Sequence, residues 1–253
     1  MSSAGRHAAI ARAVGDAGTV TVQRLAELTG ASEMTVRRDL DMLAAQGVLE
    51  RVRGGARTLL LRGDEPPFVL RALEAVDAKR RIATAVAGMI ADGESVLLDS
   101  GTTCLEVARL LHGRSTTVVP LSLQAIEVLG RAPALCTLVV PGGQPRPGEG
   151  ALAGPLTITS LAALRFDTAV IGCCGLEGAD GLTAYDLDDA AVKKACVSSS
   201  RRVIVAADAR KIGRTAYAHV VPVSGLHAVV TEPAAPADQV SALEDAGVVV
   251  SVV

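Results

Sequence analysis

Residues 32–43, "SEMTVRRDLDML", decide the fold of the first part of the chain, because they read as a short amphipathic helix with two adjacent arginines in its middle. At about 100° per residue, one face of this helix is apolar, and Arg38 falls on the opposite face with Arg37 beside it. The apolar face is formed by Val36, Leu40 and Leu43. The stretch therefore predicts a helix that is anchored on one side and presents guanidinium groups near its N-terminal end.

Two further helices are predicted before this one. Ile10 and Val14 lie at helical spacing in the first, and the second follows Thr21, a favoured N-cap residue. The apolar positions of the second helix are Val22, Leu25 and Leu28. The turn "TGAS" that follows contains Gly30, whose backbone freedom permits a steep reversal. Ser32 is the expected N-cap of the third helix.

A basic hairpin is predicted after the third helix. The stretch "VLERVRGGARTLLL" (48–61) has two β-prone arms around Gly54 and Gly55, a dipeptide that suits a tight turn. Three arginines are expected about the tip: Arg51, Arg53 and Arg57. A helix, a glycine-containing turn, a helix with arginines near its start and a basic hairpin form the layout of a winged helix-turn-helix.

This layout fits the chemistry of DNA recognition. A helix fits the major groove of B-DNA, and an arginine can hold guanine through two hydrogen bonds. Arginines of the hairpin would contact phosphates and fix the register without reading sequence. For an isolated helix, we would favour the alternative that Arg37 and Arg38 only solvate an exposed face or pair with Asp41. The joint occurrence of turn, helix and basic hairpin favours DNA binding.

The charge distribution agrees with a DNA-binding N-terminal domain. The net charge of the 253 residues is -2, but residues 1–57 hold eight arginines against six acidic residues, for +2. The rest of the chain holds 17 basic and 21 acidic residues, for -4. Positive charge is therefore concentrated where a nucleic-acid contact is expected.

The pattern changes after the hairpin. Residues 58–72, which include "RGDEPPF", read as a linker because of their charges and two prolines. From about residue 73, helices alternate with short apolar strands such as "SVLLD" (95–99) and "RVIVAAD" (202–208). This alternation predicts an α/β domain with a parallel sheet buried on both faces. We therefore expect a DNA-binding domain over 1–57 and an α/β sensor domain over 73–253.

A polar turn between a strand and a helix is the strongest ligand-site feature of the second domain. In "VLLDSGTTCLEVARLL" (96–111), the hydroxyls of Ser100, Thr102 and Thr103 would converge with backbone N–H groups at a helix N-terminus, which favours phosphate binding. The turn is not a P-loop, because it lacks Gly-Lys-Ser/Thr. Ser and Thr also cap helices that bind no ligand, so that alternative stays open. The stretch "GCCGLEGADGLT" (172–183) lacks the spacing of a dinucleotide motif.

Other classes of site receive little support. The five cysteines are odd in number, with no CxxC pair and no histidine at metal-ligand spacing, which favours free buried thiols over a metal site. The neighbours Cys173 and Cys174 leave redox or ligand chemistry as the less favoured alternative. No apolar run approaches the roughly 18 residues needed to cross a bilayer, and the N-terminus lacks a secretory signal. We expect a soluble cytoplasmic protein with no membrane partner.

The stretch "ASEMTVRRDLDMLAAQGVLERVRGGA" (31–56) resembles the N-terminal signature of the DeoR family of bacterial transcriptional regulators. That signature has a serine, a threonine, an "RRDL" run, a later glycine and an Arg-x-x-Gly-Gly-Ala wing. The resemblance implies that the third helix recognises operator DNA. The candidate DNA contacts are Ser32, Thr35, Arg37, Arg38, Arg51 and Arg53.

The resemblance extends over the second domain through "DSGTT" (99–103), "LAGP" (152–155), "GLT" (181–183) and "DARK" (208–211). The sensor half of this family is similar in fold to ribose-5-phosphate isomerase, so the implied effector is a phosphorylated sugar. By position, the turn would hold the phosphate, a lysine would add charge and two aspartates would face the hydroxyls. The candidate effector contacts are Asp99, Ser100, Gly101, Thr102, Thr103, Gly142, Gly143, Lys193, Asp208 and Lys211.

One departure from the family pattern bears on this site. Where the family commonly has a Thr-Asn pair after the second strand of the sheet, this chain has Pro120 and Leu121, followed by Ser122. The change removes a hydrogen-bond donor and acceptor from the edge of the expected site. The effector or the response to it can therefore differ from that of other members.

The sequence favours a regulator, most simply a repressor of sugar-metabolism genes that leaves double-stranded operator DNA when a phosphorylated sugar binds. A homodimer or homotetramer is expected, because such operators usually have two half-sites. No cofactor, metal or catalytic residue is expected. The alternative is a sugar-phosphate isomerase or deaminase with an accessory domain, using carboxylates as acid and base: Asp180, Asp186, Asp188 and Asp189. Asp188 and Asp189 are more simply explained as stabilising the start of a helix that contains Lys193.

Overall fold

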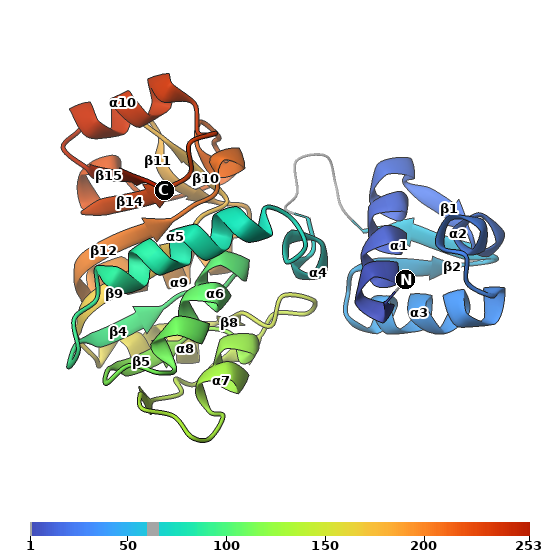
Figure 1. Cartoon of the computed structure of the whole chain (residues 1–253), viewed down its shortest axis with the longest axis horizontal. Helices are drawn as coiled ribbons and strands as arrows, with labels where there is room; N and C mark the ends of the chain where they lie inside the picture. Colours follow the sequence, from blue (N-terminus) through green and yellow to red (C-terminus); the bar gives the residue numbers. More distant parts are fainter. Residues whose placement is uncertain (1, 60–65) are drawn as a thin grey trace. The chain divides into compact units, whose positions relative to one another are not determined.

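The computed structural model describes residues 2–59 and 66–253, and the chain divides into two compact units, Met1–Glu74 and Ala75–Val253 (Figure 1). Each unit has its own hydrophobic core. Across these described residues, every helix is too short or too polar to span a lipid bilayer.

The N-terminal unit combines three helices with a small antiparallel sheet in the order β1-β3-β2. Its elements are α1 (Ser3–Ala17), β1 (Thr19–Thr21), α2 (Val22–Thr29), α3 (Glu33–Ala45), β2 (Leu49–Val52) and β3 (Gly55–Thr58). The predicted three helices and hairpin are confirmed. Strand β1 was not predicted, because three residues carry too little periodicity to indicate a strand.

Local sequence explains the boundaries of α2 and α3. Thr21 Oγ1 accepts a hydrogen bond from the N–H of Arg24, and Ser32 Oγ accepts one from the N–H of Thr35, each at 3.2 Å. Both predicted N-caps are therefore confirmed. Gly30 ends α2 with a φ of 68°, a left-handed conformation that other residues adopt with strain.

The hairpin between β2 and β3 needs its two glycines for different reasons. Gly54 has a φ of 80°, in the left-handed region. Gly55 packs so closely on β1 that an added Cβ would lie 2.2 Å from the carbonyl oxygen of Val20. The expectation that Arg57 lies near the tip is wrong, because β3 pairs it with Glu50 of β2, at an Nη2 to Oε2 distance of 2.5 Å.

Part of the segment expected to be a linker, residues 58–72, is structured. Thr58 is the last residue of β3, and a short helix α4 (Phe68–Arg71) packs on α1. Leu70 of this helix is buried in the core of the N-terminal unit. Pro67 is the N-cap of α4, so a proline that was expected to mark a linker instead precedes a helix. Residues 60–65 of the segment lie outside the described residues.

The C-terminal unit is an α/β domain around a seven-stranded sheet in the order β15-β14-β12-β9-β4-β5-β6, with all neighbouring strands parallel. The strands are β4 (Ser95–Leu98), β5 (Thr117–Pro120), β6 (Thr137–Leu138), β9 (Phe166–Gly172), β12 (Ser200–Ala206), β14 (Ala228–Thr231) and β15 (Val249–Val252). The helices are α5 (Val76–Gly88), α6 (Thr102–Leu111), α7 (Leu123–Leu129), α8 (Pro155–Ala162), α9 (Leu187–Ser198) and α10 (Ala237–Asp245). The predicted parallel α/β architecture is confirmed.

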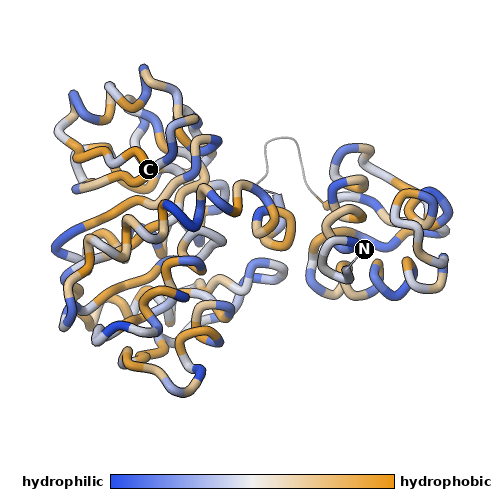
Figure 2. The backbone as a smooth tube through the Cα atoms, in the orientation of Figure 1, coloured by the Kyte–Doolittle hydropathy of each residue, from blue (hydrophilic) through white to orange (hydrophobic). Residues whose placement is uncertain are grey.

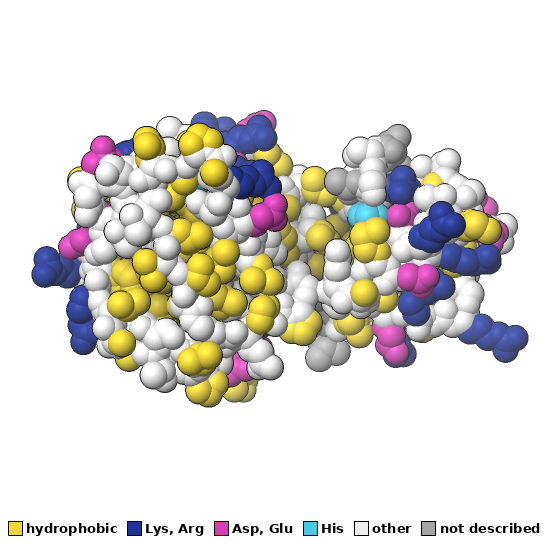
Figure 3. All heavy atoms as spheres, turned by 90° about the horizontal axis from the view of Figure 1, so that it is seen from below, with side chains coloured by type: hydrophobic (Ala, Val, Ile, Leu, Met, Phe, Trp, Pro, Cys, Tyr) yellow, Lys and Arg dark blue, Asp and Glu magenta, His cyan; other side chains and the backbone are white. Residues whose placement is uncertain are grey.

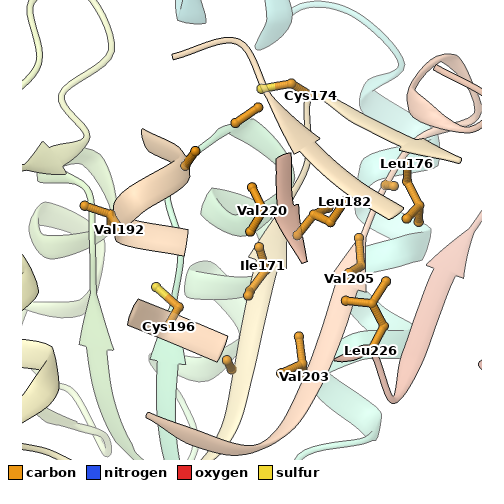
Figure 4. Close-up of a cluster of buried hydrophobic side chains, with 14 of the residues drawn as sticks. Ile171, Cys174, Leu176, Leu182, Val192, Cys196, Val203, Val205, Val220 and Leu226 are labelled. Atoms are coloured by element: carbon orange, nitrogen blue, oxygen red, sulfur yellow. The ribbon is translucent and has the colours of Figure 1, made fainter. Parts of the chain in front are cut away.

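Both faces of the sheet are buried, which explains why its strands are nearly continuous hydrophobic runs (Figure 2). On one face, α5 and α6 pack on the strands through residues such as Ile82 and Val107. On the other face, α8 and α9 share a core with Ile171 and Val205 of the sheet, part of which Figure 4 shows. A small antiparallel sheet completes this second core: β10 (Gly175–Glu177), β11 (Gly181–Ala184) and β13 (Ala218–Val221).

The strand order reverses between β4 and β9. From β4 the chain adds β5 and β6 on one side, and β9, β12, β14 and β15 then follow on the other. The carboxyl ends of parallel strands at such a reversal are the usual ligand-binding position of an open α/β sheet. Asp99 follows β4 and Gly172 ends β9, and the N–H of Asp99 donates to the carbonyl of Val170 at 2.9 Å.

Candidate DNA interface and effector site

Helix α3 buries one face and exposes its two arginines. Val36 and Leu40 are fully buried in the core of the N-terminal unit, whereas Arg37 and Arg38 are exposed. Arg37 donates to Glu33, one turn earlier, at 2.8 Å. Among the described residues, Arg38 has no hydrogen bond or ion pair, so its guanidinium is available to a ligand.

Asp41 does not pair with either arginine of α3. Its carboxylate lies 3.0 Å from Nε of Arg51, in strand β2 of the hairpin. Arg51 also donates to the carbonyl of Gly55, at 3.4 Å. This ion pair joins α3 to the β2–β3 hairpin, which is the wing of the domain. Arg51 therefore positions the wing in the free protein. Arg53 lies in the exposed turn of the wing and has no ion pair among the described residues.

Ser32 and Thr35 are occupied at the start of α3. In addition to the backbone cap, the two hydroxyl oxygens lie 2.9 Å apart. Both side chains therefore hold the first turn of the helix, and they lie on the exposed end that carries Arg38. A capped first turn fixes the direction in which the arginines project.

A buried carboxylate that sequence reasoning missed joins α3 to α1. Arg6 donates to Asp39 through Nε and Nη2, at 2.6 and 3.1 Å, and His7 Nε2 lies 2.8 Å from the same carboxylate. Burial would raise the pKa of Asp39, but the hydrogen bonds from Arg6 and His7 hold it below its usual value. Its spacing from Val36 and Leu43 places Asp39 on the apolar side of α3, and that signal could have identified it.

In the C-terminal unit, the turn after β4 leaves a helix N-terminus without a cap. Gly101 has a φ of 102° and precedes α6, whose first-turn N–H groups donate to no side-chain cap. The residues of the turn are half-buried or buried, and the hydroxyls of Ser100, Thr102 and Thr103 have no hydrogen-bond partner among the described residues. By contrast, α7 is capped by Ser122. Free N–H groups and hydroxyls at a helix N-terminus suit an anion such as phosphate.

Asp99 and Lys193 form a buried ion pair beneath this turn. Lys193 Nζ donates to Asp99, and Asp189 of the same helix α9 lies 3.5 Å from Nζ. The N–H of Gly172 donates to Asp99 at 3.1 Å. Burial lowers the pKa of Lys193, but the charges of Asp189 and Asp99 outweigh it and hold the pKa well above its ordinary value. These side chains satisfy one another and position the turn, whereas the sequence expectation was that Lys193 adds charge at the effector phosphate.

Asp208 is also engaged within the protein. Its carboxylate accepts hydrogen bonds from the N–H and Nε of Arg210, at 3.1 and 3.0 Å, and from Nη2 at 3.1 Å. Burial would raise the pKa of Asp208, but the hydrogen bonds and charge of Arg210, with the charges of Lys79 and Lys211, hold it below its usual value. Lys79 is buried in the first turns of α5 and was not singled out from the sequence. Three cations therefore lie around the end of β12.

Gly142 and Gly143 pack against the start of α8. The carbonyl of Gly142 accepts a hydrogen bond from Thr157 Oγ1 at 3.0 Å. A Cβ added to Gly143 would lie 2.1 Å from the same Thr157 Oγ1. Their small size is explained by close packing on α8. Leu121, at the position of the expected family asparagine, is buried in the core, and Ser122 caps α7.

The cysteines near the ion pair are buried thiols. Burial raises the pKa of Cys104 and of Cys196, and the charge of Asp99 acts in the same direction. All five cysteines lie in the part of the chain that the structure describes, and each stands outside any disulfide. The expectation of buried thiols is confirmed for Cys104, Cys174 and Cys196, whereas Cys136 and Cys173 are only half-buried.

Two family models match this chain. The DeoR-like helix-turn-helix domain matches residues 6–59, and the DeoR C terminal sensor domain matches residues 74–233, which is more than half the sequence. The chain belongs to the DeoR family. It is a transcriptional regulator with a DNA-binding helix-turn-helix domain and an effector-sensing domain, and not an enzyme.

Relatives of this DeoR-family chain match it along most of its length. The glycerol-3-phosphate regulon repressor of Escherichia coli (strain K12) is 30% identical over 97% of each chain. The HTH-type transcriptional regulator GlpR of Haloferax volcanii is 30% identical, covering 99% of this chain and 98% of its own. The HTH-type transcriptional repressor CsqR of E. coli is 30% identical, covering 95% of this chain and 92% of its own.

Solved structures of ribose-5-phosphate isomerase match this DeoR-family chain, as expected, but with low structural similarity. Ribose 5-phosphate isomerase A from Methanocaldococcus jannaschii has a TM-score of 0.38 and 17% identity, over 51% of each chain. D-ribose-5-phosphate isomerase in complex with phospho-erythronic acid has a TM-score of 0.40 and 18% identity, over 55% of each chain. At this level the likeness supports no conclusion about activity.

The carboxylates that an enzyme would require have other roles in this DeoR-family chain. Asp186 caps α9 by accepting from the N–H of Asp189 at 2.9 Å. Asp188 and Asp189 lie in the first turn of that helix, as expected from their position before Lys193. Asp180 accepts from Thr215 Oγ1 at 2.8 Å.

Proposed function

We propose that this DeoR-family regulator represses sugar-metabolism genes and leaves double-stranded operator DNA when a phosphorylated sugar binds. The names of its relatives support the direction of control, since those from E. coli are a glycerol-3-phosphate regulon repressor and a transcriptional repressor. Loss of operator affinity on effector binding is a coupling free energy between two sites.

We assign DNA recognition to α3 and the wing. Arg38, exposed and unpaired among the described residues, reads a base edge, and Arg37 contacts a base or phosphate after it leaves Glu33. Arg53 at the tip of the wing contacts a phosphate. Ser32, Thr35 and Arg51 orient these groups, and their own contacts with DNA are to the backbone.

We assign the phosphate of the effector to the turn over Ser100–Thr103. The observation that carries this proposal is the uncapped N-terminus of α6, where three hydroxyls have no partner among the described residues. Lys211 supplies charge from the end of β12. Asp99 and Lys193 hold the turn from beneath through their buried ion pair. Asp208 borders the sugar hydroxyls at the end of β12, and Gly142 and Gly143 lie at the margin of the site.

A homodimer or homotetramer completes the proposal. A symmetric oligomer places two recognition helices on two half-sites, which raises affinity and specificity together. Leu121 in place of an asparagine favours an effector that makes fewer hydrogen bonds at that edge.

The experiment that tests the proposed function has two arms. In the first, the full chain selects duplexes from a random pool, and enrichment of one shared sequence is expected. In the second, a panel of sugar phosphates is added to the chain alone, and one of them should raise its thermal stability, since a ligand at a hundred times its dissociation constant adds roughly 2.7 kcal/mol. That ligand should also release the selected duplex. Enrichment of no sequence would contradict the DNA assignment, and stabilisation by no phosphate ester would contradict the effector assignment.

A further inference from the structure

One surface of the C-terminal unit carries exposed hydrophobic side chains that its own fold does not use. Leu135 is 72% exposed, Val140 is 54% exposed and Leu156 is 62% exposed. Folding left these large apolar groups in water, although most others of the unit are buried. The face of this unit in Figure 3 is correspondingly rich in hydrophobic side chains and poor in charged ones.

The two segments that carry these side chains meet at the edge of the sheet. Leu135 and Val140 belong to the segment 131–140 along strand β6, which is the last strand of the seven-stranded sheet. Leu156, in α8, lies against the same segment, because a Cβ on Gly142 would be 2.7 Å from its Cγ. The hydrogen bond from Thr157 to the carbonyl of Gly142 fixes the two parts together. We call this area, formed by residues 132–143 and the outer side of α8, the β6–α8 face.

The β6–α8 face has no charged residue at its centre. Residues 132–143 and 150–164 contain no Asp, Glu, Lys, Arg or His. The nearest charges before β6 neutralise each other, since Arg131 pairs with Glu127 at 2.5 Å. Edge strands of monomeric proteins are usually protected by charged side chains, and a charge-free apolar edge is a typical association surface.

We propose that the β6–α8 face is the surface through which two copies of this chain associate. A two-fold contact brings the same residues of both copies together, so a charged face would repel itself and a charge-free apolar face does not. An apolar centre with charges confined to its rim is also the composition of a homodimer interface. This inference rests on the oligomer in the proposed function and names the surface that forms it.

The main test measures the molar mass of the full chain by sedimentation equilibrium. Leu135→Asp and Leu156→Asp should each shift the wild-type oligomer to the next smaller assembly, because each puts two buried carboxylates across the two-fold axis. The matched control is Val249→Asp. Val249 is 65% exposed on β15, at the opposite edge of the same sheet, so this variant should keep the wild-type mass. Near-ultraviolet circular dichroism checks that each variant is folded.

A second measurement needs no substitution. Cys136 belongs to the same edge segment and is half-buried, with its thiol turned toward the carbonyl of Leu129 in α7. Its alkylation rate should fall as the wild-type protein is concentrated and the oligomer forms, while the rate at half-buried Cys173 stays constant. Equal behaviour of the two thiols would count against the proposal.

The outcomes separate this inference from the proposed function. If the wild-type chain selects operator DNA but is a monomer, or if only Val249→Asp lowers the mass, the β6–α8 face is not the interface and the DNA assignment stands. If the chain selects no DNA but Leu156→Asp still lowers the mass, the interface stands and the proposed function fails.

Discussion

At the scale of single residues, the buried ion pair in the C-terminal unit has the largest energetic consequence. Lys193→Met leaves Asp99 and Asp189 in a buried site without their cation. Removing one partner of a buried pair costs about 3–5 kcal/mol, because the remaining charge is uncompensated. Urea unfolding of the C-terminal unit should show a loss of this size.

The neighbouring lysine supplies the control for that experiment. Lys194 is exposed. Lys194→Met should therefore change the free energy of unfolding by no more than about 0.5 kcal/mol. Equal losses from the two substitutions would show that Lys193 owes its effect to something other than its buried partners.

Arg38 tests the reading of DNA sequence. Arg38→Ala should weaken binding to the selected operator by about 1–3 kcal/mol and relax the preference at one base pair. Arg53→Ala, at the tip of the wing, should weaken binding to all duplexes alike. It should also reduce the slope of log binding constant against log salt concentration by about 1. Competition binding between operator and random duplexes distinguishes the two effects. Unchanged discrimination by Arg38→Ala would exclude Arg38 as a base contact.

At the scale of secondary-structure elements, the wing depends on its close packing against β1. Gly55→Ala should destabilise the N-terminal unit, because the new Cβ would approach the carbonyl oxygen of Val20 within 2.2 Å. Gly15→Ala is the matched change in α1, where nothing lies within 4 Å of an added Cβ. It should stabilise the unit by about 0.5–1 kcal/mol. Thermal unfolding measures the stability of both variants. A Gly55→Ala variant more stable than the wild type would refute the packing argument.

The link between α1 and α3 predicts a pH dependence. Because the pKa of Asp39 lies below its usual value of 3.8 in the folded protein, its ionised form stabilises the fold. That contribution is fully present above the unfolded value and is lost as pH falls through the lower folded value. The stability gap between the wild type and Asp39→Asn should therefore be constant near neutral pH and shrink below pH 3.8.

Asp41→Asn is the control for this effect, since Asp41 is exposed and, within the described part of the chain, its ion pair is with Arg51 at the surface. Its stability gap to the wild type should be small throughout. A gap for Asp39→Asn that widened on acidification would have the opposite sign to the one that a lowered folded-state pKa requires.

Elements with long periodic patterns could be predicted from sequence, and elements held by distant partners could not. The spacing of Val36 and Leu40 indicated the buried face of α3, and the apolar runs at 95–99 and 202–208 indicated β4 and β12. The two-residue strands β7 (Gln144–Pro145) and β8 (Leu152–Ala153) carry too little pattern.

The candidate site shows the same limit. The turn over Ser100–Thr103 could be found because its residues are consecutive. The partners of Lys193 and Asp39 could not, because Asp99 lies 94 residues from Lys193 and Arg6 lies 33 residues from Asp39. A single sequence shows no relation between positions so far apart, so the buried pairing of Lys193 with Asp99 could not be predicted.

At the scale of the whole molecule, each of the two units carries its own candidate binding site. The N-terminal unit presents an unpaired arginine on an anchored helix, and the C-terminal unit presents uncapped N–H groups where its strand order reverses. Both sites have the character of anion-binding sites. Regulation requires that binding at one changes affinity at the other.

The most direct test of this coupling uses fluorescence anisotropy of the selected operator duplex, with the sugar phosphate that stabilises the chain added to the protein-DNA complex. The wild type should release the duplex. Thr102→Val, which removes one hydroxyl from the turn, should bind the duplex with wild-type affinity and retain it at the same effector concentration. If Thr102→Val released the duplex at the effector concentration that releases the wild type, the assignment of the effector phosphate to this turn would be contradicted.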